Sequence, residues 1–188
     1  DAATYDVGDQ IFQCGRHVDV FKLFLMWKSR GDVGMAKYVD DSIARNDLFN
    51  SVLQKRCKEF QPLLKEPSRV PCTCFFYIPK KLQKKNIVSS QETFNSENFP
   101  IYKFRKSDDN KQEETSELFD VFEKVTPRAK LLMMKRGSMV LTMSKMGNDI
   151  PNFWRFVANG AVSWSESQIN DFLDEVADAC ECVFKELY

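Results

Sequence analysis

The sequence is poor in histidine, carries no net charge and has no long apolar run. His17 is its only histidine, beside six cysteines, which makes a poor zinc-ligand set, so we expect no metal site. Lys plus Arg equals Asp plus Glu at 27 each, so the charge balance does not indicate a nucleic acid as partner. The longest apolar runs, such as residues 70–79, are too short to span a bilayer, and we expect no membrane span.

The chain also lacks an initiator methionine and an N-terminal signal pattern. It begins with DAATYDVGD, which reads like sequence from the middle of a protein, so we expect a fragment; a mature protein trimmed at Asp1 is the alternative. A hydrophobic content of 43% is enough to build a core.

The cysteines form no C-x-x-C motif and instead include two C-x-C pairs. Cys72 and Cys74 lie in a strand-like run, where residues two apart share a face. Cys180 and Cys182 lie in a helix-like run, where residues two apart point in different directions. Because no single geometry serves both pairs, we expect free thiols in a reducing cytoplasm.

The first fifty residues predict two helices. Residues 19–30 are apolar around most of a helical circumference, which is typical of a buried helix, and Gly31 is a natural end to it. Asp32 is placed to cap a second helix, whose apolar spacing continues to about Arg56.

The rest of the chain predicts two pairs of short strands. Residues 60–64 and 70–79 favour one pair with a turn at 66–68, and residues 138–144 and 152–158 favour another. We expect a small α+β layer in which an antiparallel sheet carries helices on one face.

Two amphipathic helices accompany these strands. One begins near Leu118 and ends at Gly137, with Pro127 either kinking it or starting a second helix. The last helix is predicted to begin with a capping box formed by Ser165 and Gln168. Residues 80–116 are polar and aperiodic, so they are predicted to be a long solvated insertion.

Arg155 is the residue that most suggests a binding site. It lies within NFWRFVA, where strand alternation separates it from Trp154 and Phe156. A guanidinium among apolar residues is costly unless it meets an anion, and its planar fork suits a carboxylate. A substrate carboxylate is one interpretation; a local ion pair or an exposed strand face is the other, and the residues alone favour neither.

Cys14 and His17 are close enough in sequence to raise the question of a thiol–imidazole pair. No supporting Asn or Asp pattern and no oxyanion-type glycine loop accompanies them, so we do not expect this chemistry. GDVG and GNDIP are turn sequences rather than phosphate-binding loops.

Several segments resemble one family in the same order along the chain. YDVGDQIFQCGRHVDVFKLFLMWKSRGDVG is similar to a segment of animal glutamate decarboxylases and of the cysteine sulfinate and aspartate decarboxylases. CTCFFYIP, RAKLLMMKRGSMV and NFWRFVANG resemble later segments of the same proteins, the last of them an N-F-F-R-M segment. The likeness covers almost the whole chain and is weakest across residues 80–116.

This resemblance to the group II pyridoxal-phosphate (PLP) dependent amino-acid decarboxylases implies an α/β PLP-dependent transferase-like fold, the aspartate aminotransferase fold type I. It implies that residues 1–56 are the end of a large domain with connecting helices and that residues 57–188 are the C-terminal small α+β domain. The family is one of cytoplasmic, homodimeric lyases of amino-acid metabolism that use PLP.

The resemblance also assigns residues. Arg155 matches the arginine that pairs with the substrate α-carboxylate, and Cys14, Gly15 and Arg16 match a turn near the active site at the dimer interface. The family's Schiff-base lysine lies in an N-P-H-K motif that this sequence lacks, so that lysine is expected upstream. We therefore expect no catalytic residue in this chain and no activity from it alone.

The resemblance favours an acidic substrate: glutamate, cysteine sulfinate or aspartate. LTMSKM stands where the family usually has a G-Y-Q-P-like run, near the expected specificity region, so the choice among these acids and other amino acids stays open. The alternative function is a non-catalytic truncated paralogue that acts as a dimerisation or interaction module.

Overall fold

The structure is a computed structural model that describes residues 19–64, 70–83, 112–147, 150–159 and 162–188. The chain divides into two compact units, Asp1–Asp40 and Asp41–Tyr188. The expected boundary between residues 56 and 57 concerns the domains of a larger protein, and it stays a prediction.

Helix α1 spans Asp19–Lys55 and breaks at Gly31, where φ is 66° and ψ is −179°. Glycine adopts this left-handed φ readily because it has no Cβ atom. Across the break, the Trp27 indole N–H donates a hydrogen bond to Asp32 Oδ1 at 2.6 Å. The predicted end of the first helix at Gly31 and the extent of the second helix are confirmed.

The prediction that residues 19–30 are buried is wrong for this chain. Val20 is 83% exposed, and Phe21, Phe24 and Trp27 are each about half exposed. A helix that is apolar nearly all round is normally buried, but the described residues do not pack over this one. The apolar pattern alone therefore does not establish that the helix is buried in this chain.

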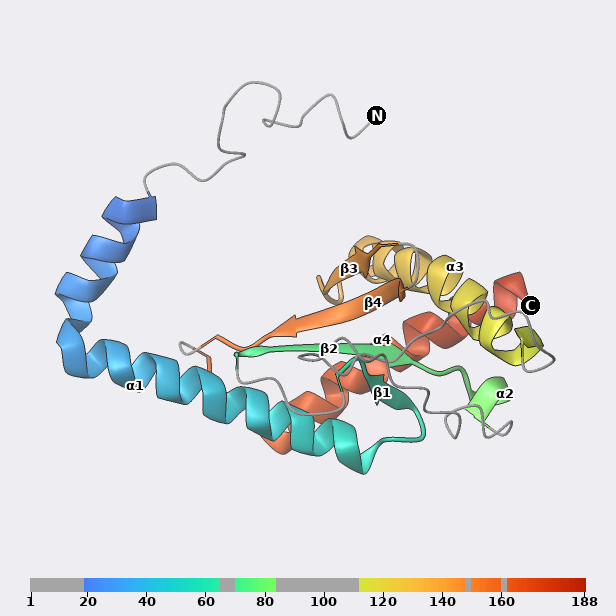
Figure 1. Cartoon of the computed structure of the whole chain (residues 1–188), viewed down its shortest axis with the longest axis horizontal. Coiled ribbons are helices and arrows are strands. Elements are labelled where there is room, and N and C mark those ends of the chain that lie inside the picture. The colour runs from blue at the N-terminus through green and yellow to red at the C-terminus, as the bar shows by residue number, and fades with distance from the viewer. Residues whose placement is uncertain (1–18, 65–69, 84–111, 148–149, 160–161) are drawn as a thin grey trace, which may run out of the picture. The chain divides into compact units, whose positions relative to one another are not determined.

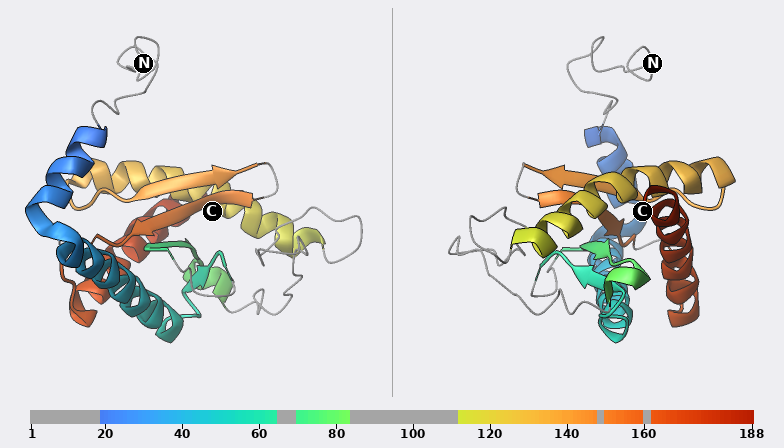
Figure 2. Two further views of the ribbon diagram at one scale, coloured as in Figure 1. Left: turned by 60° about the vertical axis from the view of Figure 1, so that its left-hand side comes forward. Right: turned by 90° about the vertical axis from the view of Figure 1, so that its right-hand side faces the viewer.

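The second unit contains a four-stranded antiparallel sheet in the order β1-β2-β4-β3 (Figures 1 and 2). The strands are β1 (Phe60–Pro62), β2 (Cys72–Tyr77), β3 (Thr142–Met146) and β4 (Ile150–Val157). Both predicted strand pairs are confirmed. The turn predicted at residues 66–68 lies outside the described residues.

Strand β3 begins at Thr142, four residues later than predicted. The reason is the end of helix α3 (Gln112–Arg136), where Gly137 has a φ of 67°. The Gly137 N–H bonds Met134 O and the Ser138 N–H bonds Met133 O, each at 3.2 Å. This helix cap uses backbone groups that a strand starting at residue 138 would need.

Helix α3 runs through Pro127 without ending there. It also begins at Gln112, and a short helix α2 occupies Lys80–Gln83 with Leu82 buried. Both ends of the predicted insertion at residues 80–116 are therefore helical, while residues 84–111 lie outside the described residues.

Helix α4 (Glu166–Leu187) has the predicted capping box. The Gln168 N–H donates to Ser165 Oγ at 3.2 Å, and the Ser165 N–H donates to Gln168 Oε1 at 2.8 Å. Its predicted apolar stripe is buried: Ile169, Phe172, Leu173, Val176, Cys180, Val183 and Phe184.

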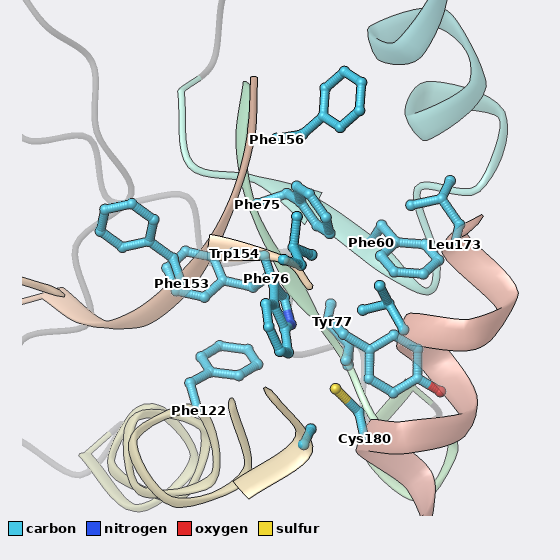
Figure 3. Packing of buried hydrophobic residues seen from close by; sticks show 14 of the residues in the cluster. Phe60, Phe75, Phe76, Tyr77, Phe122, Phe153, Trp154, Phe156, Leu173 and Cys180 are labelled. Atoms are coloured by element: carbon cyan, nitrogen blue, oxygen red, sulfur yellow. The ribbon is translucent and has the colours of Figure 1, made fainter. Parts of the chain in front are cut away.

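The core is an aromatic cluster between the sheet and the helices (Figure 3). Phe49, from the second half of α1, stacks on Phe156 with ring centroids 3.9 Å apart and contacts Phe172 of α4 at 5.9 Å. These two helices cover one face of the sheet (Figure 1). Helix α3 crosses the end of the sheet, where Phe122 stacks on Phe76 at 4.7 Å.

Candidate functional site

Arg155 lies on the opposite face of the sheet, which is partly open to solvent. Along β4, Trp154 and Phe156 are buried, whereas Arg155 and Val157 are exposed. The alternation predicted from the sequence is confirmed. The buried residues anchor the strand in the core, so the strand holds Arg155 outward from a rigid support.

The neighbours of Arg155 on this face are uncharged. In the sheet register, Cys74 of β2 is opposite Arg155 on one side and Thr142 of β3 is opposite it on the other. The Thr142 hydroxyl donates a hydrogen bond to the Arg155 main-chain oxygen at 2.9 Å, which ties the two strands together at this point.

Within the described part of the chain, the Arg155 guanidinium makes no hydrogen bond or ion pair. The local ion pair considered from the sequence is therefore not formed among these residues. The geometry leaves all the donors of the fork available to an external carboxylate, which the guanidinium can bind through two parallel hydrogen bonds.

Cys74, on this face, is a poor nucleophile. Burial, together with the neighbouring Cys72, raises the pKa of the Cys74 thiol to about 12, while the charge of Arg155 acts in the opposite direction. Both cysteines are free thiols. Near neutral pH, Cys74 therefore presents a neutral thiol beside Arg155 rather than a competing anion.

An open depression of about 680 Å³ reaches from Arg155 to the start of α4. Its floor is aromatic, with Phe156, Trp164 and Phe172, and two carboxylates, Asp171 and Glu175, lie along the helix side. Glu175 accepts a hydrogen bond from the Ser138 hydroxyl at 2.6 Å. The depression thus combines one cation, an apolar floor and acidic groups.

A polar anchor at the start of β4 was not predicted from the sequence. The Asn152 N–H donates to Glu123 Oε2 and its side-chain amide donates to Glu123 O, both at 3.2 Å. Glu123 O is the carbonyl that Pro127 leaves without a helical partner, because proline has no N–H. A proline inside a helix, four residues after Glu123, was the available signal, but its distant partner could not be read from it.

The other predicted site residues, Cys14, Gly15 and Arg16, lie outside the described residues, as does His17, for which no role was predicted. Within the described ranges, no group of three or more His, Cys, Asp or Glu side chains gathers to hold a metal ion. None of the helices in those ranges is long and apolar enough to cross a membrane.

No protein-family model matches the chain. Among solved structures, the chain is similar to mouse CSAD (cysteine sulfinic acid decarboxylase) in apo form, with 27% identity and a TM-score of 0.61 over 97% of this chain. A second structure of mouse CSAD gives 26% identity and a TM-score of 0.59 over 97% of the chain. These matches cover 32% and 31% of the CSAD chain, so this chain spans about a third of that protein's length.

The chain is also similar to Oryza sativa TDC with PLP and tryptamine, at 10% identity and a TM-score of 0.50. That match covers 86% of this chain and 26% of the other, and at this identity it shows the fold alone. The resemblance read from the sequence is thus confirmed: the chain is similar to group II PLP-dependent amino-acid decarboxylases and has the fold of a C-terminal portion of these fold type I proteins.

Proposed function

We propose that this chain is the C-terminal portion of a PLP-dependent decarboxylase that removes the α-carboxylate of an acidic amino acid, and that Arg155 binds this carboxylate. The observation that carries the proposal is an outward-facing guanidinium that has no partner among the described residues. The similarity to mouse CSAD supports the reaction class.

The described residues fit the substrate side of such a site. Bound PLP supplies the electron sink for the breaking carbon–carbon bond. Arg155 holds the carboxylate by a two-point contact, which fixes the direction in which that bond points. The sequence contains no N-P-H-K motif, so we infer that the Schiff-base lysine lies upstream, in another part of the full protein.

The choice among glutamate, cysteine sulfinate and aspartate is open, because Arg155 is the one Lys or Arg among the described residues that line the depression, and it is suited to one carboxylate. The resemblance supports a homodimer in the cytoplasm, with Cys14, Gly15 and Arg16 near the active site at its interface. Light scattering on the full protein tests the dimer, and assays with each acid test the substrate.

The test of Arg155 is its replacement by alanine in the full protein. Loss of a charge-assisted pair costs about 1.5–3 kcal/mol, so we expect kcat/KM for decarboxylation to fall roughly tenfold or more. Arg155→Lys keeps the charge but loses the planar fork of donors, so its kcat/KM should lie between those of the unaltered enzyme and Arg155→Ala. Arg128→Ala, at an exposed position on α3, is the matched control.

A kcat/KM for Arg155→Ala within a few-fold of the unaltered enzyme refutes the carboxylate assignment. Absence of decarboxylation by the unaltered full protein, with PLP and each of the three acids, refutes the enzymatic function itself and favours a non-catalytic module.

A further inference from the structure

The ladder between β3 and β4 is interrupted three residues before Arg155. Ser144 pairs with Phe153, and Met146 pairs with Ile150. One residue of β3, Lys145, therefore lies opposite two residues of β4, Pro151 and Asn152, which is the arrangement of a β-bulge. The extra residue frees the main-chain groups of Asn152 from the ladder, and Pro151 has no N–H to pair.

Helix α3 takes up the groups that the bulge frees. The Asn152 main-chain N–H donates to the Glu123 carboxylate at 3.2 Å, and the Thr126 hydroxyl donates to Asn152 O at 3.4 Å. The Asn152 side-chain amide donates to Glu123 O at 3.2 Å. Lys145 forms an ion pair with the same carboxylate, so α3, β3 and β4 meet at Glu123.

Helix α3 lacks one main-chain hydrogen bond at the position of this contact. Pro127 removes the N–H that would bond Glu123 O within the helix, and the Asn152 amide takes its place. Asn152 and Thr126 are both buried, at 9% and 4% exposure, so the hydrogen bonds between β4 and α3 are shielded from water. Removing the Asn152 side-chain amide would leave Glu123 O without a hydrogen-bond donor from either the helix or the strand.

Register decides where Arg155 points. Side chains alternate along a strand, so a slip of one residue turns every side chain to the other face. Such a slip moves Arg155 from the open face into the aromatic core and moves Phe156 out. The pairing register of β3 and β4 changes by one residue at the bulge. The contacts that hold the bulge at Asn152 therefore also hold the register of the residues after it, and with it the face on which Arg155 lies.

We propose that Asn152 is a positioning residue: by anchoring the β4 bulge to Glu123 at the Pro127 site of α3, it sets the register that presents Arg155 to the substrate carboxylate. This inference rests on the proposed function of Arg155. It assigns to Asn152 no contact with substrate.

The test is a double-mutant cycle in the full protein with its cofactor. Asn152→Ala should lower kcat/KM about ten- to a hundredfold, because small displacements of a binding group have effects of this size. In an Arg155→Ala background the same change should have little further effect, since Arg155 is then no longer there to position. Asn152→Asp replaces the amide donor with an acceptor beside Glu123, and it should lower kcat/KM at least as much as Asn152→Ala does.

The matched control is Asn170→Ala on α4, where an exposed amide likewise donates to a helix carbonyl, Glu166 O, at 2.9 Å. It should leave kcat/KM unchanged. Cofactor content, read from the visible absorption of the bound cofactor, should be equal in all folded variants. If Asn152→Ala does not fold, Glu123→Gln, which keeps the acceptor but loses the Lys145 ion pair, replaces it in the cycle with a smaller expected loss of severalfold.

Three results separate the possibilities. If Arg155→Ala lowers kcat/KM and Asn152→Ala does not, this inference is wrong while the proposed function stands. If Asn152→Ala lowers kcat/KM equally with and without Arg155, Asn152 has only a general structural role, and the inference is again wrong. If Arg155→Ala has no effect, the proposed function itself is wrong, and the inference with it.

Discussion

At the scale of single residues, burial distinguishes Cys180 from Cys57. Cys180 is 1% exposed, and burial raises the pKa of its thiol above the ordinary range. Cys57 is exposed. The thiolate is the reactive form, so the burial and the raised pKa of Cys180 disfavour reaction there, whereas Cys57 is open to a reagent in solution.

We therefore expect iodoacetamide at pH 8 to alkylate Cys57 much faster than Cys180, as measured by mass spectrometry of digested protein. Raising the pH to 9 should leave Cys180 protected, because burial raises the pKa of its thiol and keeps it protonated. The control is the same reaction in urea, where both should react at similar rates. Equal rates in the folded protein would contradict the burial of Cys180.

Single-residue features were predictable where a local rule determines them. The outward direction of Arg155 follows from strand alternation, and the break at Gly31 follows from the freedom of glycine. The role of Asn152 did not follow, because its partner Glu123 lies 29 residues away in sequence. A residue-level pattern contains no information about which distant carbonyl lacks a donor.

At the scale of elements, the capping box of α4 can be tested without any assumption about function. Ser165→Ala removes the acceptor of the Gln168 N–H and should lower the free energy of unfolding by about 0.5–2 kcal/mol. Urea unfolding followed by circular dichroism measures it. Ser167→Ala, at an exposed position two residues along, is the matched control, and a similar loss there would contradict the cap assignment.

The elements that sequence alone located well are those with clear start and stop signals. Helix α4 has a capping box and an apolar stripe, and both appear in the structure. The start of β3 was misplaced because residues 138–141 have strand-like composition but belong to the cap region that follows α3. The continuity of α3 through Pro127 depends on a partner from β4, which local propensity does not reveal.

At the scale of the whole molecule, the dominant feature is the exposed apolar surface of residues 19–40. Phe21, Phe24 and Trp27 are about half exposed, with Val20 and Val33 more so. Exposed apolar side chains in such number on one helix indicate an interface or a liability to aggregate. The sequence predicted the apolar helix, but its burial depends on residues outside the helix, which a periodic pattern does not identify.

We expect this chain, expressed alone, to self-associate and to show no decarboxylase activity with added PLP. Replacing Phe21 and Phe24 with lysine should reduce the association, as measured by sedimentation velocity, because it breaks the apolar surface. Val162→Lys, at an isolated position that is 51% exposed, is the matched control. A monomeric unaltered chain would contradict the expectation of association, and measurable activity would contradict the placement of the cofactor lysine upstream.

The bulge at Asn152 also bears on the order in which the chain folds. Helix α3 precedes β3 and β4 in the sequence, so during synthesis from the N-terminus its Glu123 and Thr126 emerge from the ribosome before the hairpin does. We expect that α3, once formed, offers the hairpin a Glu123 carbonyl that has no helical N–H partner. A strand one residue out of register does not place Asn152 at that carbonyl, so this contact should favour the correct register of the hairpin as it forms.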